Sequence, residues 1–152
     1  MNLVFAPSQI ETWQIDRLRP YVRNAKMHGD DQVAKIAASM AKFGWTVPCL
    51  VADDGELIAG HGRVLATTLL GLSDVPVIRL DHLDEAERRA YRIADDRLTE
   101  MGEWDEALLR DAIAGLLADD FDLVAIGGRP FARYRVPDST LPKVAGQDCP
   151  PR

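Results

Sequence analysis

The chain of 152 residues has few of the residues that build disulfide frameworks and zinc sites. It contains two cysteines and three histidines, and none of the short Cys or His spacings that bind zinc. Cys49 lies in the apolar stretch TVPCLVA, whereas Cys149 lies in the polar ending GQDCPPR. The sequence therefore predicts neither a disulfide nor a cysteine metal site, and we expect Cys49 to be a small core residue.

Long apolar runs are also missing. No stretch approaches the roughly 20 apolar residues that span a bilayer, and neither end shows a basic segment followed by an apolar one. The content of 47% hydrophobic and 28% charged residues is typical of one compact domain. We expect a cytoplasmic protein that does not enter a membrane.

The charge balance lacks a basic excess. The formal net charge is −6, which excludes nucleic-acid binding by bulk electrostatics alone. Acids are dense over residues 100–122, while basic residues gather at 17–26 and 129–135. The acidic total is therefore still compatible with local basic patches.

Hydrophobic spacing and turn residues predict alternating strands and helices. Apolar residues recur every three or four positions from Val33 to Phe43, with Asp30 or Asp31 as a helix cap and Gly44 as a stop. The expected strands are 12–18, 46–52, 56–59 and 75–80, and the expected helices are 31–43, 63–70, 84–98 and 105–118. Residues 127–152 lose this pattern, which predicts an extended or disordered tail.

The stretch ELIAGHGRVLA places two glycines, a histidine and an arginine between an expected strand and an expected helix. Glycine allows close backbone approach, and the free amides at a helix N-terminus attract anions. Arg63 can add a bidentate contact to a phosphate. Taken alone, the turn fits equally well a tight connection in which Arg63 is solvated.

The same turn partly matches a dinucleotide-binding fingerprint, with Asp81 at about the distance of a ribose-binding acid. Leu65 stands where that fingerprint has its third glycine, and the chain is short for two mononucleotide-binding halves. We therefore do not adopt a Rossmann fold.

The order of three segments is more informative than the turn. IAASMAKFGWTVPCLV, DDGELIAGHGRVLATTLLGLSDVPVI and RIADDRL follow one another, and over about residues 12–126 this succession resembles the ParB/sulfiredoxin superfamily. It looks most like the ParB-like "nuclease" domains of phages and mobile elements, which are often joined to DNA methyltransferases. The resemblance implies an α/β fold, a small mixed sheet packed with helices and followed by a C-terminal helical subdomain. The implied domain is 1–126, with a nucleotide-binding core at 12–80 and a helical part at 84–126.

The resemblance also implies that Gly60, His61, Gly62 and Arg63 form a Gly-x-x-Arg turn that holds nucleotide phosphates. ParB proper has Glu and Arg in place of His61 and Gly62, so the phosphate grip should be weaker or different. Sulfiredoxin has its catalytic cysteine in this turn. This chain has no cysteine there, and sulfiredoxin activity is not expected.

Asp95 and Asp96 look similar to a ParB acid-amide pair that helps to bind magnesium and nucleotide. Adjacent carboxylates are suitable ligands for Mg²⁺, although successive helix positions diverge by about 100 degrees. The alternative is a solvated pair that forms ion pairs with Arg92 or Arg97.

Four residues nearer the N-terminus have both a functional and a structural interpretation. Asn24 and Lys26 match a loop that approaches the nucleotide in relatives, or they are simply exposed. Ser39 matches a serine common in the family's first helix, or it lies beside the core. If the loop that contains His28 folds across the glycine turn, His28 and His61 lie side by side. Either histidine is then a candidate to contact phosphate or to transfer a proton.

Two further groups of residues are assigned mainly to structure. The three tryptophans are expected to pack rather than to stack on bases. Interleaved acids favour a solvated helix face over a DNA contact for a set of three arginines. These arginines are Arg88, Arg89 and Arg92.

Together these features predict a ParB-like domain that binds CTP or another nucleoside triphosphate with Mg²⁺ in DNA-related processes of a phage or mobile element. Slow nucleotide hydrolysis, with His61, Asp95 and Asp96 as the catalytic candidates, is a further option. Two alternatives stay open: a metal-dependent DNA nuclease, and a non-catalytic adaptor for a DNA methyltransferase or another DNA-bound partner. DNA would be contacted directly or through such a partner, and a homodimer is compatible with the sequence.

Overall fold

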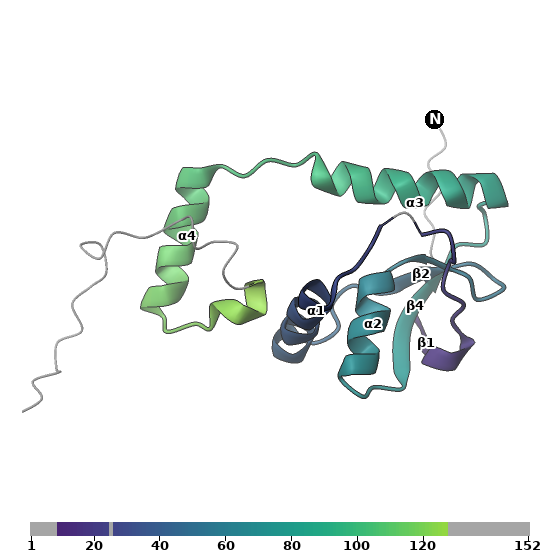
Figure 1. The fold of residues 1–152 in the computed structure, drawn as a ribbon, viewed down its shortest axis with the longest axis horizontal. Coiled ribbons are helices and arrows are strands. Elements are labelled where there is room, and N and C mark those ends of the chain that lie inside the picture. Colours follow the sequence, from purple (N-terminus) through teal and green to yellow (C-terminus); the bar gives the residue numbers. More distant parts are fainter. Residues whose placement is uncertain (1–8, 25, 128–152) are drawn as a thin grey trace, which may run out of the picture.

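The computed structural model describes residues 9–24 and 26–127, which form a small sheet with helices on both faces (Figure 1). The strands are β1 (Glu11–Gln14), β2 (Cys49–Val51), β3 (Leu57–Ala59) and β4 (Asp74–Arg79). The helices are α1 (Asp30–Phe43), α2 (His61–Leu69), α3 (Glu85–Glu100) and α4 (Glu106–Ala118), with short 3-10 turns η1 (Ile15–Arg17) and η2 (Leu123–Ile126). None of the helices described over these residues is long and apolar enough to cross a membrane.

The four strands form a mixed sheet in the order β1-β4-β2-β3. β2 and β3 make an antiparallel hairpin, β4 pairs parallel to β2, and β1 pairs antiparallel to β4. Because β3 runs against β2, its last residue, Ala59, lies opposite Leu50 near the start of β2. The glycine turn is therefore fixed beside Cys49.

The two faces of the sheet carry separate apolar clusters, since successive side chains of a strand point to opposite faces. One cluster contains Trp13, Cys49, Val51, Leu57 and the buried valines of β4, with Val64 of α2 packed against it. The other contains Ile58 and Leu80, with Tyr91 of α3 packed against it. α2 and α3 consequently approach the sheet from opposite sides.

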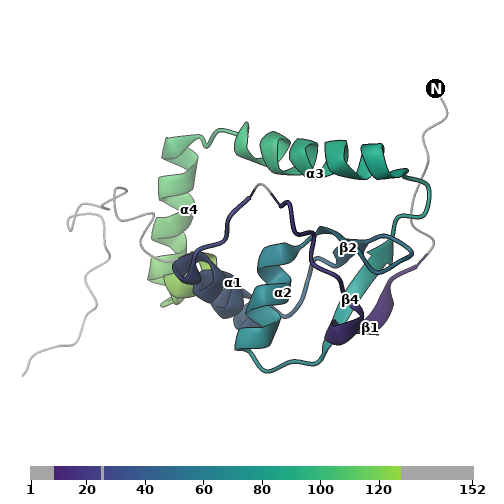
Figure 2. The same ribbon diagram turned by 45° about the vertical axis from the view of Figure 1, so that its right-hand side comes forward.

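The C-terminal helices return to the body at α1. The rings of Phe43 and Phe121 stack with centroids 6.0 Å apart, and Lys42 Nζ lies 5.0 Å from the centroid of Phe121. Figure 2 shows η2 beside α1, while α4 connects it back to α3. The last helical segment is thus held by contacts with the first helix.

Three local expectations need correction. The first strand ends at Gln14, and η1 replaces its expected second half. Gly29 is the N-cap of α1, where no side-chain cap bond forms among the described residues, and Asp30 and Asp31 lie inside the first turn. α2 begins at His61 rather than Arg63 because Gly60 already has the left-handed conformation that turns the chain into the helix. The predicted disordered tail falls almost wholly outside the described residues.

Candidate functional site: a cavity at the N-terminus of α2

The glycine turn presents free backbone amides. Gly60 has φ 104° and ψ 18°, a left-handed conformation that favours glycine. The first helical bond runs from the Val64 N–H to the Gly60 carbonyl at 3.0 Å, and among the described residues no side chain caps α2. The first turn contains no acid. The amides of His61, Gly62 and Arg63 therefore form an anion-attracting terminus.

Gly60 is also pressed against β2. A Cβ at this position would lie 2.7 Å from Cys49 Sγ and 3.3 Å from Cys49 Cα. Cys49 is fully buried, as expected, and burial raises the pKa of its thiol to about 11, which Arg63 only partly offsets. The thiol is therefore protonated at neutral pH and is not an activated nucleophile.

Gly62 leaves room for a residue from another segment. A Cβ there would lie 2.8 Å from Ile36 Cδ1 on α1 and 3.2 Å from ring atoms of His28. His28 Nδ1 is 3.1 Å from Gln32 Oε1, which holds the ring beside α1. The absence of a side chain at Gly62 thus allows α1 and the His28 loop to pack closely on the first turn of α2.

Four segments line a cavity of about 320 Å³ in front of this helix terminus. They are the loop before α1, α1 itself, the end of β3 with the turn into α2, and α3. The lining residues are Asn24, Lys26, His28, Gln32, Ile36, Ile58, Ala59, Gly60, His61, Gly62, Arg63, Arg92, Asp95, Asp96 and Thr99. A neighbouring cavity of about 400 Å³ between the loop and α3 shares Asn24, Lys26, Arg92 and Asp96 with it. We call the first of these the central cavity.

The structure brings together all but one of the residues named as site candidates. Asn24, Lys26 and His28 of the loop, the turn 60–63, and Asp95 and Asp96 of α3 all line the central cavity. Ser39 is on α1, partly buried, and is not among the lining residues.

The charges in the cavity are unequally paired. Lys26 Nζ lies 3.0 Å from Asp96 Oδ1, which links the loop to α3. The alternative pairing of the two aspartates with Arg92 or Arg97 does not form, because Arg92 binds Glu56 and Arg97 lies 3.7 Å from Glu100. Over the described residues, Arg63 has no carboxylate within ion-pair distance. Arg63 is therefore available to an anion at the helix terminus.

His61 is held neutral. Burial, followed by the positive charges of Arg92 and His28, lowers the pKa of His61 from 6.5 to about 4, and Asp96 opposes this change. Its Nε2 is shielded from solvent and has no hydrogen-bond partner among the described residues. A group with this pKa is a poor proton acceptor at neutral pH.

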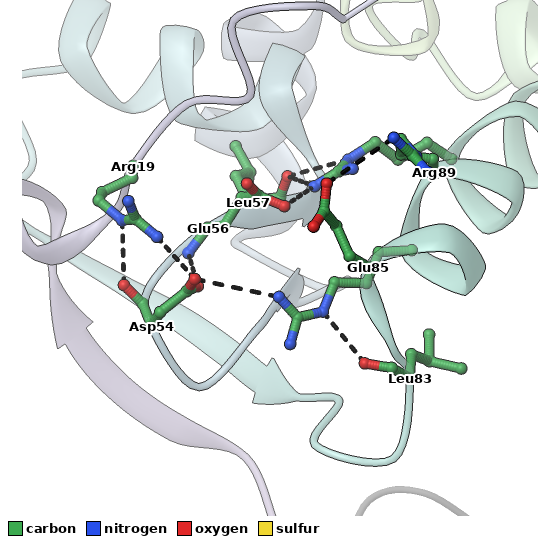
Figure 3. A network of polar contacts seen from close by, with 9 residues as sticks. Arg19, Asp54, Glu56, Leu57, Leu83, Glu85 and Arg89 are labelled. Carbon is green, nitrogen blue, oxygen red and sulfur yellow. Dashed lines mark hydrogen bonds and ion pairs between the residues drawn. The ribbon is translucent and has the colours of Figure 1, made fainter.

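Sequence reasoning assigned Arg92 to a solvated face, and the structure corrects this. Its side chain is only 6% exposed, and it reaches from α3 to Glu56 and to the carbonyl of Leu57 on β3. Figure 3 shows this network, in which Asp54 and Glu56 of the β2–β3 hairpin join Arg19 and α3. Arg89 remains solvent-exposed at 53% and pairs with Glu85. The sequence did contain a signal for the buried position of Arg92. Helical spacing places Arg92 on the same side of the helix as Arg88, Thr99 and the aspartates Asp95 and Asp96.

The three tryptophans differ in how far they are buried. Trp13 is buried in the core and Trp45 is partly buried, but Trp104 is 69% exposed in the segment between α3 and α4. The packing role predicted for all three is therefore wrong for Trp104, which lies in the connection from α3 to α4.

Comparison with known families decides the classification. Residues 4–95 match the family model of the ParB N-terminal domain. The chain belongs to the ParB N-terminal domain family. A ParB-like nuclease domain-containing protein of Escherichia coli (strain K12), YnaK, is 40% identical over 89 residues, which are 59% of this chain and 94% of YnaK.

Solved ParB structures share the fold. The C-terminally truncated chromosome-partitioning protein ParB from Caulobacter crescentus, complexed with CTP-gamma-S, superposes with a TM-score of 0.65 at 17% identity, covering 79% of this chain and 72% of that one. A sulfiredoxin from Arabidopsis thaliana has a TM-score of 0.46 and 20% identity, covering 53% of this chain and 94% of that one. The predicted fold class, a small mixed sheet with helices and a C-terminal helical part in the manner of ParB N-terminal domains, is confirmed.

Proposed function

We propose that the central cavity of this ParB N-terminal domain binds CTP or another nucleoside triphosphate. The observation that carries the proposal is the uncapped N-terminus of α2, which opens into a cavity beside an arginine that pairs with no carboxylate among the described residues. A second support is that the Caulobacter crescentus relative was solved with CTP-gamma-S.

The residues have distinct roles in this proposal. The amides of His61, Gly62 and Arg63 receive phosphate oxygens, and the Arg63 guanidinium supplies a bidentate contact. Asn24, Lys26 and His28 close the cavity from the loop side, where Lys26 stands between a phosphate and Asp96. Ser39 is too far along α1 to line the cavity, so we assign it no direct contact.

Asp95 and Asp96 fit a magnesium ion that is bound together with phosphate. Both line the central cavity, and Mg²⁺ prefers a few carboxylate oxygens, phosphate oxygens and retained waters. Mg²⁺ would neutralise charge on the phosphates. Asp96 can bind the metal ion only when its 3.0 Å ion pair with Lys26 is broken. Phosphate, which attracts Lys26, and the metal ion, which attracts Asp96, therefore both compete with this ion pair.

Hydrolysis of the nucleotide is expected to be slow. His61 is the catalytic candidate nearest to the helix terminus, but its pKa of about 4 makes it a weak base at neutral pH. Its proposed part is to orient a water or a phosphate oxygen rather than to abstract a proton.

We place this binding in DNA-related processes of a phage or mobile element, where the domain acts on DNA directly or through a partner such as a DNA methyltransferase. Family membership supports the link to DNA processes. The proposed partnership is tested by measuring whether the protein associates with a purified DNA methyltransferase in the presence and absence of nucleotide.

Calorimetric titration with CTP, ATP, GTP and UTP in the presence of Mg²⁺ tests the binding proposal. Wild-type protein should bind at least one of them, and Arg63→Ala should weaken binding by at least about tenfold, since it removes a charge-assisted contact. Arg110→Ala is the matched control, because Arg110 is exposed on α4 and lines neither the central cavity nor its neighbour. No heat with any of the four nucleotides would sink the proposal.

A metal-dependent nuclease is the second candidate, because His61, Asp95 and Asp96 share one cavity and YnaK carries "nuclease" in its name. Against it, the described residues contain no group of three His, Cys, Asp or Glu side chains suited to a metal. Plasmid cutting with Mg²⁺ that disappears in the double variant Asp95→Ala with Asp96→Ala would favour the nuclease. Uncut plasmid together with nucleotide binding would exclude it.

A further inference from the structure

Arg92 has one nitrogen that its structural contacts do not use. Nη2 donates to Glu56 Oε1 and, at 3.2 Å, to the Leu57 carbonyl, and Nε donates to the same carbonyl at 3.4 Å. The guanidinium carbon lies 3.7 Å from the centroid of the Tyr21 ring. These contacts fix the side chain in one position. Nη1 is shielded from solvent and has no hydrogen-bond partner within residues 9–24 and 26–127.

A buried cationic N–H without a partner is costly, so native structures rarely leave one unused without a functional reason. Arg92 lines the central cavity, as does His61, whose Nε2 is likewise buried and unpartnered among the described residues. After burial, the positive charge of Arg92 is the next cause of the lowered pKa of His61, in agreement with their common place in the cavity. This corner of the cavity therefore favours an oxygen that carries negative charge.

The occupant has to be small. Nη1 lies beneath the surface, so a phosphate of a DNA strand lying across the protein does not reach it. Neither aspartate of the cavity pairs with Arg92: Asp96 lies 3.0 Å from Lys26 Nζ, and Asp95 Oδ1 lies 3.5 Å from the Tyr91 hydroxyl. A free polyphosphate chain of a nucleotide is anionic and slender enough to enter the cavity that the helix terminus and Arg92 both line.

We propose that Arg92 binds an anionic oxygen of the ligand's polyphosphate through Nη1, while Nη2 and Nε hold the guanidinium on β3. This inference rests on the proposed nucleotide binding and adds a contact from α3 to those of the α2 turn. Arg92 is then a ligand-binding residue as well as the tie between α3 and the hairpin.

Arg92→Lys is the first test, with inorganic tripolyphosphate and CTP plus Mg²⁺ as the probes in calorimetry. A lysine keeps the charge but cannot hold β3 and reach into the cavity at once, so affinity for both probes should fall at least about tenfold. Arg110→Lys, at an exposed position of α4 that lines neither cavity, should bind both probes as wild type does. Equal binding by wild type and Arg92→Lys would overturn the inference.

A second measurement needs no variant. In ¹⁵N-resolved NMR spectra of wild-type protein, tripolyphosphate should shift the guanidinium resonances of Arg92 and slow their exchange with water. The resonances of Arg110, which lines neither cavity, should stay unchanged. Unmoved Arg92 resonances, or no tripolyphosphate binding at all, would count against the inference. If tripolyphosphate binds through Arg92 but no nucleotide binds, the inference stands and the proposed function fails.

Discussion

At the scale of single residues, the site depends on two glycines whose missing side chains have different consequences. Gly60 combines a positive φ with contact to Cys49, whereas Gly62 is helical and leaves space for His28 and Ile36. One glycine sets the backbone of the turn, and the other sets how closely the loop and α1 approach it.

Gly60→Ala should lower the free energy of unfolding by about 2–5 kcal/mol. A left-handed conformation costs an alanine about 1–2 kcal/mol, and the forced contact with Cys49 adds about 1–3 kcal/mol. Urea denaturation measures the change. Gly71→Ala is the control, because Gly71 has φ 69° but open space around it, and it should lose only the conformational part. Equal losses in both variants would contradict the predicted clash.

His61 should make the protein less stable in mild acid. The unfolded chain takes up a proton at this histidine near pH 6.5, whereas the folded chain resists until about pH 4. The unfolded state therefore binds more protons in this interval, so the contribution is complete above pH 6.5 and is lost as the pH falls to about 4. After allowance for a ring that is only partly buried, the loss is roughly 1–2 kcal/mol.

Unfolding by urea at pH 7 and at pH 4.5 checks this pH dependence in matched variants. His61→Gln removes the titrating group, so its stability should fall less with acid than that of wild type. His82→Gln, at an exposed position, should behave as wild type does. A wild-type pH profile in His61→Gln would show that another group is responsible.

At the scale of elements, α3 is held to the sheet by polar contacts more than by a broad apolar face. Its start is fixed by a capping box between Asp84 and Glu87, and its middle by Arg92 on β3. Ile93 and Leu98 remain exposed on the same helix. The orientation of α3, and with it the position of Asp95 and Asp96, therefore depends on the hairpin carboxylates.

Glu56→Ala should destabilise the protein by about 3 kcal/mol or more. Removing this carboxylate leaves the buried guanidinium of Arg92 without its counter-charge, which is far costlier than losing an exposed ion pair. Glu85→Ala removes the exposed partner of Arg89 and should cost less than about 0.5 kcal/mol. Thermal and urea unfolding compare the two, and similar small losses would mean that solvent screens Arg92 after all.

At the scale of the whole molecule, the first and last helical segments are joined by aromatic contact. Phe121 follows α4 and stacks on Phe43 at the end of α1. The sheet has its own core clusters, to which Phe121 does not contribute. The C-terminal helices should therefore open separately from the sheet.

Phe121→Ala should loosen α4 and η2 without unfolding the sheet. The stacked pair contributes about 0.5–1.5 kcal/mol beyond the apolar area it buries. Amide hydrogen exchange should accelerate in residues 106–126 and stay unchanged in β2 and β4. Phe121→Leu keeps apolar bulk and should give a smaller effect. A uniform acceleration over the whole chain would indicate that the C-terminal helices and the sheet unfold together.

The sequence was informative wherever a signal is local. The apolar spacing after Val33 and the glycines at chain reversals predicted most strands and helices to within a few residues, whereas the expected cap at Asp30 or Asp31 was wrong. The turn 60–63 could be recognised because a strand, glycines and a helix start are adjacent in the chain. The end of β1 and the start of α2 were misplaced because long-range pairing and the conformation of Gly60 fix those boundaries.

The sequence alone determined which groups were available to the site. These are the free backbone amides that follow Gly60, one arginine in the first turn of the helix and two adjacent aspartates. The tertiary structure decided which of them meet: it brought the loop with Lys26 onto Asp96, left Ser39 outside the cavity and buried Arg92 rather than Arg89. The physical reason is that a residue's type fixes its functional group, whereas its burial and its ion-pair partners depend on the segments that pack against it. Helical spacing does not distinguish Arg89 from Arg92 until β3 and the hairpin carboxylates lie beside α3.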